Sequence, residues 1–227
     1  MTQPNQKNPA LTSMSKISDQ DILQEIGNIG AGQATIALST ILGEQVNVEV
    51  PRLFMVPPHL VPKIYQKHDT PVAAIFMQLR GEADCDIMLI FEAKEAEKIG
   101  ALMAKNAADE EADCEMERSA LEELGSIMIC SFLNAVANFT DMELVPTPPT
   151  LIFDAFDAVI DGLLVKQALC SDIAAVFDSR FWRSGSSADG YLILFPGETL
   201  QKVLVSTGKN WLNQDFNQKQ TSTLLVH

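Results

Sequence analysis

The feature that most constrains this chain is a pattern of residues that occurs twice, 98 positions apart. The intervals within each copy are four, three and twenty-three residues. The first copy consists of Asp21, Glu25, Asn28 and Pro51, and the second of Ser119, Glu123, Ser126 and Pro149. Self-similarity at a fixed spacing indicates a duplicated structural unit. Both halves are therefore expected to form the same elements and to present the same helical surface.

The composition is that of an acidic globular protein. The chain has 227 residues, of which 47% are apolar, and this is enough to bury a substantial core. The net charge of −14 argues against nucleic acid as a partner, because phosphate contacts require clustered Lys and Arg. No apolar run reaches the roughly 20 residues that a membrane-spanning helix needs. The first residues also lack the basic and apolar segments of a secretory signal. We expect a cytoplasmic protein with no membrane partner.

The sequence shows no motif for a metal centre or a bound cofactor. The four cysteines are scattered without a Cys-x-x-Cys pair, and the three histidines are not at metal-ligand spacing. The glycines 27, 30 and 32 read G-x-x-G-x-G, without the preceding strand or the following Lys that a phosphate loop requires. No nucleophile elbow is present. We therefore expect this chain to bind no cofactor and no metal ion of its own.

Hydrophobic periodicity and turn residues predict the same elements in each half. In the first half these are a helix at 19–42 ended by Gly43, a strand at 45–50, an irregular proline-rich segment at 51–71, a hairpin of strands 72–79 and 86–91, and a helix at 94–105. In the second half they are a helix at 117–139, a strand within 142–153 and a hairpin of strands 173–181 and 191–195. The segment 91–99 then aligns with 195–203 at an offset of 104.

These elements predict one domain at 18–207, made of two repeats at 18–108 and 116–207 that an acidic linker joins. The polar segments 1–17 and 208–227 are expected to be a disordered leader and a poorly ordered tail. The fold class is α/β (α+β) with pseudo-two-fold symmetry. Because hairpin strands are antiparallel, the shared sheet should be mainly antiparallel, with the two long helices packed on one face.

The first long helix carries the residues with the clearest chemical potential. Asp21, Glu25 and Asn28 are separated by four and three positions, so they lie near one face of the helix. Asp21 is also explained as the partner of Ser18 in a helix cap. Six apolar residues are expected to form the buried side of this helix: Ile22, Leu23, Ile26, Ile29, Ile36 and Leu38.

Three glycines within the same helix require an explanation, because each costs about 1 kcal/mol relative to Ala. They are Gly27, Gly30 and Gly32. Close approach by another part of a protein is the usual reason for such a glycine. The sequence leaves open whether that approach is packing between the two long helices or docking of a partner.

An exposed Glu and Asn without a metal or a nucleophile can still position a water molecule. The amide of Asn28 can donate one hydrogen bond to a water and accept another from it. Orienting a water in line with a phosphoryl group is a known catalytic contribution. A neighbouring Glu25 could pair with a basic residue of a substrate protein and fix how it docks.

The pattern Asp21-x-x-x-Glu25-x-x-Asn28, followed by Pro51, resembles the repeated signature of the CheC/CheX/FliY phosphatases of bacterial chemotaxis. The run from Leu23 to Gly32 is especially similar to CheC, and the tandem motif also suits CheC. The resemblance covers roughly residues 18–205 and includes both repeats.

The resemblance implies hydrolysis of the phospho-aspartate on a CheY-type response regulator, whose own active site supplies magnesium. Asn28 would orient the attacking water, and Glu25 would pair with the regulator's active-site lysine. Glu123 would act in the same way at a second site. That site departs from the family pattern because Ser126 replaces Asn, so we expect one fully active site, at Asn28. CheD is a possible further partner.

Two other functions remain open from the sequence. One is a non-catalytic binding module that sequesters phosphorylated CheY or CheD. The other is a structural adaptor that binds a regulator regardless of its phosphorylation.

Overall fold

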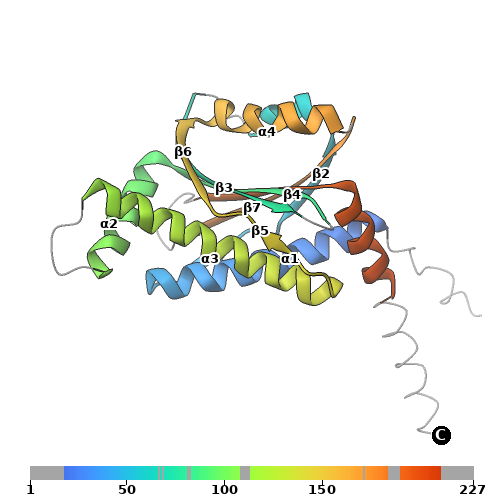
Figure 1. Ribbon diagram of the computed structural model, residues 1–227, viewed down its shortest axis with the longest axis horizontal. Helices are drawn as coiled ribbons and strands as arrows, with labels where there is room; N and C mark the ends of the chain where they lie inside the picture. Colours follow the sequence, from blue (N-terminus) through green and yellow to red (C-terminus); the bar gives the residue numbers. More distant parts are fainter. Residues whose placement is uncertain are drawn as a thin grey trace, which may run out of the picture.

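A computed structural model describes residues 18–65, 67, 69–80, 83–107, 113–170, 172–183 and 190–210. The chain forms three layers, with a curled sheet between helices on both faces (Figure 1). The predicted leader at 1–17 lies outside the described residues, as does the predicted tail after residue 210. The predicted mixed α/β fold is confirmed.

Both halves contain the same succession of elements. The first half consists of α1 (Asp19–Leu42), β1 (Val46–Val48), β2 (Arg52–Val56), η2 (Pro58–Ile64), β3 (Pro71–Arg80), β4 (Cys85–Glu92) and α2 (Ala93–Ala107). The second half consists of α3 (Cys114–Thr140), β5 (Val145–Pro146), β6 (Thr150–Ala155), α4 (Phe156–Cys170), β7 (Ala174–Arg183), β8 (Gly190–Pro196) and a final helix at 198–210. The element order therefore confirms the internal repeat.

The sheet interlocks the two halves. Its strand order is β1-β7-β8-β4-β3-β5, every pair is antiparallel, and β4 pairs with β8 at the centre. The short strands are exchanged, because β1 and β2 pair with β7 whereas β5 and β6 pair with β3. Each repeat thus completes the sheet edge of the other, which makes the pair of repeats one structural unit.

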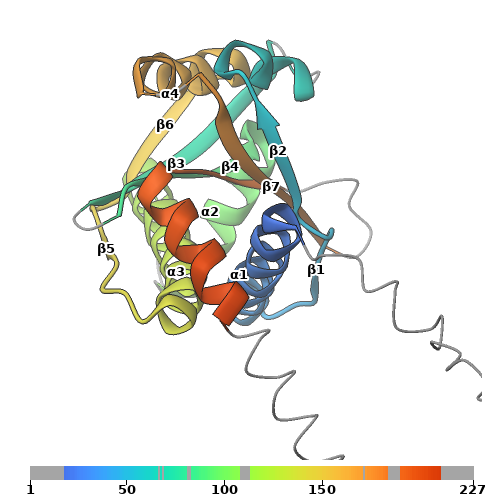
Figure 2. The ribbon, with the colours of Figure 1, turned by 90° about the vertical axis from the view of Figure 1, so that its right-hand side faces the viewer.

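The two faces of the sheet carry separate apolar cores. The helices α1 and α3 cover one face together with α2 and the final helix, and this core includes Phe91, Phe132 and Phe177 (Figure 2). The helix α4 and the 3-10 helix η2 cover the other face, where Phe156 and Tyr191 are buried. The prediction that both long helices lie on one face is correct.

Two elements differ from the sequence prediction. The segment 51–71 was expected to be irregular, but it contains β2 and η2. Its prolines flank the strand instead of interrupting it, and Pro58 occupies the first turn of η2, where no backbone donor is needed. The helix α4 was not predicted, because its apolar residues recur almost without a polar face. It fills the layer opposite the long helices.

The ends of both long helices are set by their caps. The Oγ of Ser18 accepts from the Asp21 backbone N–H at 3.1 Å, and Asp21 Oδ2 accepts from the Ser18 N–H at 2.9 Å. The predicted cap and the terminating Gly43, with a φ of 67°, are confirmed. The second helix begins at Cys114, earlier than the predicted 117, because Asp113 accepts from the Met116 N–H at 2.8 Å.

The alignment at an offset of 104 holds for the helices but not for the strands. It matches buried Ala96 with buried Leu200, which lie in α2 and the final helix. In the preceding strands, however, Phe91 faces the core under α1 and α3, whereas Phe195 faces the core under α4. Successive side chains of a strand point to opposite faces of the sheet, so equivalent residues must lie on the same face. The predicted match of Phe91 with Phe195 is therefore wrong by an odd number of residues.

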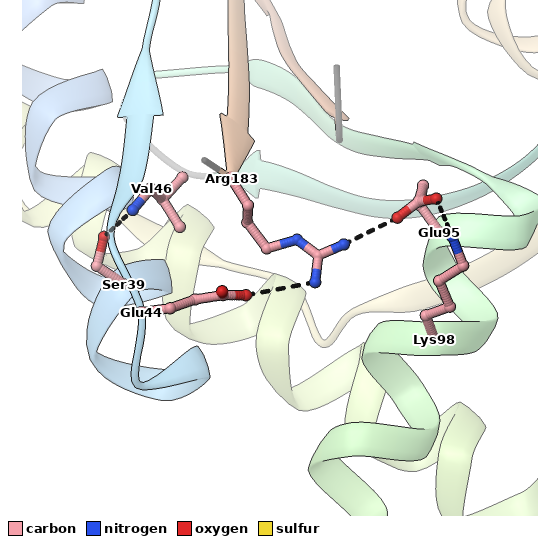
Figure 3. Close-up of polar contacts among 6 residues, drawn as sticks. All are labelled: Ser39, Glu44, Val46, Glu95, Lys98 and Arg183. Atoms are coloured by element: carbon pink, nitrogen blue, oxygen red, sulfur yellow. Dashed lines mark hydrogen bonds and ion pairs between the residues drawn. The ribbon is translucent and has the colours of Figure 1, made fainter. Parts of the chain in front are cut away.

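A cluster of charged residues fixes the carboxyl end of α1. Arg183 of β7 bridges Glu44, at 3.3 Å, and Glu95 of α2, at 2.8 Å (Figure 3). Lys98 contacts the same Glu95 at 2.5 Å. Because Arg183 reaches residues on both sides, it connects the segment after α1, the start of α2 and the sheet.

Within the described residues, α3 is the one helix that is long and apolar enough to cross a membrane, by length and composition alone. It packs against α1 and the sheet, and Leu124 and Ile129 are completely buried in that contact. This burial is typical of a core helix.

Candidate functional site

The two long helices lie antiparallel and side by side, and glycines allow their close packing (Figures 1 and 2). A Cβ atom on Gly30 would overlap the ring of Phe132 on α3. A Cβ atom on Gly27 would lie 2.9 Å from Phe177 of the sheet, and the equivalent Gly125 meets Ile75. Internal packing therefore accounts for Gly27 and Gly30. It does not account for Gly32, because nothing lies within 4 Å of its Cβ position.

Glu25 and Asn28 form a hydrogen-bonded pair on the outer side of α1. Asn28 Nδ2 donates to Glu25 Oε2 at 3.0 Å. Glu25 is exposed, Asn28 is half-buried, and Asn28 Oδ1 is buried with no hydrogen-bond partner among the described residues. An unpaired buried acceptor costs about 1–3 kcal/mol, and such groups in native structures often serve a function. The predicted pair is thus brought together.

Gln24 connects this pair to the Pro51 of the repeated motif. The side-chain amide of Gln24 donates to the Pro51 carbonyl, and Gln24 Oε1 accepts from the Leu53 N–H at 3.1 Å. These two bonds fix α1 against the start of β2, next to Glu25. The sequence analysis did not assign Gln24 a role. The signal that could have identified this contact is the interval between Glu25 and Pro51, which is the same in the second copy. An equal interval in both copies indicates that the two segments contact each other.

The second copy has the same framework but different polar groups. Glu123 is exposed and Ser126 is half-buried, at the positions equivalent to Glu25 and Asn28. Neither side chain forms a hydrogen bond or ion pair with another residue in the described part of the chain. Glu122 stands where Gln24 stands in the first copy, and a carboxylate has no N–H to donate.

Asp21 belongs to the helix cap. The hydrogen bonds from Ser18 lower the pKa of the Asp21 carboxyl below its usual value of 3.8, so Asp21 is ionised at neutral pH. Its Oδ2 accepts from both the N–H and the hydroxyl of Ser18, which agrees with the capping role that the sequence predicted.

The outer side of α1 is more apolar than the sequence predicted. Ile29 and Ile36 were expected to be buried, but they are 45% and 60% exposed. The stripe of apolar residues extends further around the helix than the two cores can cover. Ile22, Leu23, Ile26 and Leu38 are buried as predicted. Among the residues that the structure describes, no group of three or more His, Cys, Asp or Glu is placed to hold a metal ion.

Comparisons with known proteins identify the family of this chain. Residues 19–55, which include Glu25, Asn28 and Pro51, match the model of the CheC-like family. The chain is 30% identical to the CheY-P phosphatase CheC of Bacillus subtilis strain 168 over 199 aligned residues. The aligned region covers 85% of this chain and 95% of that protein.

Solved structures show the same fold. The structure of FliY from Thermotoga maritima has a TM-score of 0.66 at 18% identity, over 87% of this chain and 98% of that one. The FliM middle domain from H. pylori has a TM-score of 0.59 at 10% identity, over 85% and 99%. With a relative of 30% identity along most of its length, the chain belongs to the CheC-like family of chemotaxis proteins.

Proposed function

We propose that this chain is a phosphatase that hydrolyses the phospho-aspartate of a CheY-type response regulator, with Asn28 as the water-orienting residue. The observation that carries the proposal is the Glu25–Asn28 pair, in which Glu25 holds the amide nitrogen at 3.0 Å and leaves Oδ1 without an internal partner. The similarity to a CheY-P phosphatase supports the same substrate class.

The reaction needs only a positioned water. Its oxygen attacks phosphorus, the bond between phosphorus and the aspartyl oxygen breaks, and the products are the carboxylate and inorganic phosphate. Asn28 Oδ1 is buried in the free chain, so docking of the regulator has to expose it; it then accepts a hydrogen bond from this water, and the second N–H of Nδ2 donates one to it. The magnesium ion belongs to the regulator and neutralises the phosphoryl oxygens. Correct orientation alone accounts for a substantial part of such an acceleration.

Glu25 has two tasks in this proposal. In the free protein it accepts from Asn28 and so fixes the rotation of the amide. A carboxylate has further lone pairs, and in the complex these receive the regulator's lysine. Glu25 is exposed in the free chain, and this ion pair sets the docking register more than the affinity.

The second copy is proposed to dock a receiver domain without comparable turnover. Glu123 retains the acceptor for the lysine, whereas the short hydroxyl of Ser126 offers no planar amide. The Ser126 position supports the alternative function, because a site that binds the phosphorylated regulator without hydrolysing it sequesters it. A chain in which both sites behaved in this way would be a binding module and not a phosphatase. For both functions we propose a cytoplasmic location. We also retain the prediction that CheD is a second partner.

The decisive experiment follows phosphate release from CheY labelled with ³²P at its aspartate, with the chain at one hundredth of the CheY concentration. Wild type should clear many equivalents. Asn28→Ala should lose about 100-fold in rate, while Ser126→Ala should change little. Retention of rate in Asn28→Ala would refute the assignment of Asn28. Binding of phosphorylated CheY without any turnover would establish sequestration instead.

A further inference from the structure

One glycine of α1 is not explained by the fold. Gly27 and Gly30 allow close packing, but the Cβ position of Gly32 faces open space. A glycine within a helix costs about 1 kcal/mol relative to Ala, so a requirement outside the folded chain is indicated. Gly32 lies between the two exposed residues Ile29 and Ile36, one helical turn from each.

These three residues continue the face that carries the catalytic pair. At 100° per residue, Gly32 and Ile36 lie within about 20° of Glu25 around the helix, and Ile29 lies within about 40°. The face is therefore polar at its amino end, where Glu25 and Asn28 lie, and apolar at its carboxyl end. Ile29 and Ile36 flank a gap that Gly32 leaves without a side chain.

We propose that Ile29, Gly32 and Ile36 form a docking strip that holds the receiver domain by an apolar side chain seated over Gly32. The inference rests on the proposed function, and it adds a specificity determinant to that site. In this arrangement Glu25 and Asn28 supply register and chemistry, and the docking strip supplies most of the apolar contact.

The usual size of a protein interface indicates that the receiver domain is the partner that covers the docking strip. With a rise of 1.5 Å per residue, Ile36 lies about 12 Å along the helix from Asn28. A standard interface buries about 800 Å² on each partner, which corresponds to a disc of about 16 Å radius. A domain whose interface of this size is centred near Asn28 therefore also covers Gly32 and Ile36.

The equivalent surface of α3 lacks these features. Asn134, which is exposed, stands at the position of Ile36, and half-buried Cys130 stands at the position of Gly32. The gap and one of its two flanking apolar residues are thus absent from the copy that also lacks the Asn. The docking strip and the amide occur together on α1.

The test is a steady-state and binding study with Bacillus subtilis CheY, ³²P-labelled for turnover and beryllofluoride-activated for affinity. Ile36→Asn copies α3 and should raise KM and Kd about tenfold with kcat nearly unchanged. Gly32→Leu should block the gap and weaken binding at least as much, while the melting temperature stays equal or rises. The controls are Val165→Asn, at a residue 66% exposed on α4, and Gly162→Leu, at a glycine with nothing within 4 Å.

Unchanged KM and Kd in both α1 variants, with wild-type turnover intact, would overturn the docking strip and leave the proposed function standing. Wild type that neither binds nor dephosphorylates CheY would overturn both. If light scattering shows a dimer of the free chain that Ile36→Asn converts to a monomer, the strip is a contact between copies and the inference is wrong.

Discussion

The two long helices occupy equivalent places on the sheet but present different chemistry. Gly27 of α1 and Gly125 of α3, 98 residues apart, both lie directly against the sheet. On the outer side the two copies differ. Ser126 stands at the position equivalent to Asn28, and Asn134 stands at the position equivalent to Ile36. The comparison shows that the glycine that lies against the sheet is retained in both copies, while the positions of Asn28 and Ile36 diverge.

The divergence extends to the bonds that hold each site. Gln24 fastens α1 to Pro51 through two hydrogen bonds, and Glu122 cannot repeat the one that requires a donor. The second helix therefore has lost the amide, the apolar strip and one anchoring bond together. These differences are consistent with a single catalytic site on a symmetric scaffold.

The largest expected effect comes from making the two sites alike. Asn28→Ser gives both helices a Glu–Ser pair, and turnover of phosphorylated CheY should fall about 100-fold because the planar amide is lost. The double variant Asn28→Ser with Ser126→Asn should recover only part of the rate, since α3 lacks the docking strip. Full recovery in the same radiolabel assay would show that the amide alone distinguishes the two helices.

The next effect concerns the two glycines that face the sheet. Gly125→Ala should lower the free energy of unfolding by about 2–3 kcal/mol, because its Cβ would overlap Ile75, which is fully buried and β-branched. Gly27→Ala should cost less, since it meets only the edge of the Phe177 ring at 2.9 Å. Urea unfolding measures both, and equal losses would contradict the tighter packing assigned to α3.

These positions also show how far the sequence alone leads. The fixed spacing predicts the repeat. The sequence also predicts the Ser18–Asp21 cap and the shared face of Glu25 and Asn28, because each depends on residues close together in the chain. It does not predict the exchange of β2 and β6 between hairpins, which depends on pairing across more than 70 residues. The exposure of Ile29 and Ile36 was also missed, because helical periodicity does not tell how much of an apolar stripe the neighbouring layer covers.

Another difference between the halves lies at the start of the exchanged strands. Arg52 pairs with Asp178 in the ladder of β2 and β7, while Thr150 pairs with Phe76 at the equivalent place. Arg52 Nη2 lies 2.6 Å from Asp178 Oδ2, and the Asp178 side chain is fully buried. Burial raises the pKa of the Asp178 carboxyl above its usual 3.8, although the hydrogen bond from Arg52 opposes this shift.

Arg52→Thr, which copies the other half, should lower the free energy of unfolding by about 2 kcal/mol at pH 7, because it leaves a buried carboxylate without its main partner. The folded-state pKa of Asp178 lies above the unfolded one, so its ionisation removes stability as pH rises from 3.8 through the folded value. Without Arg52 the folded-state pKa of Asp178 rises further, so the deficit of Arg52→Thr should shrink as pH falls from the variant's folded value to the wild-type folded value. A deficit that is constant with pH would show that Asp178 is not the group affected.

The smallest expected effect tests the two helix caps against each other. Ser18→Ala removes the hydroxyl that accepts from the Asp21 N–H and should cost about 1 kcal/mol in a thermal melt. Asp113→Ala removes a single accepting bond, to the Met116 N–H, whereas Ser18 and Asp21 bond reciprocally, so the loss at Ser18 should be the greater one. The lowered pKa of Asp21 means that its contribution is present above 3.8 and disappears as pH falls through the folded value. The loss of stability caused by Ser18→Ala should consequently become smaller in strong acid. An equal loss at both caps would mean that the reciprocal bond of Asp21 adds nothing to the stability of the start of α1.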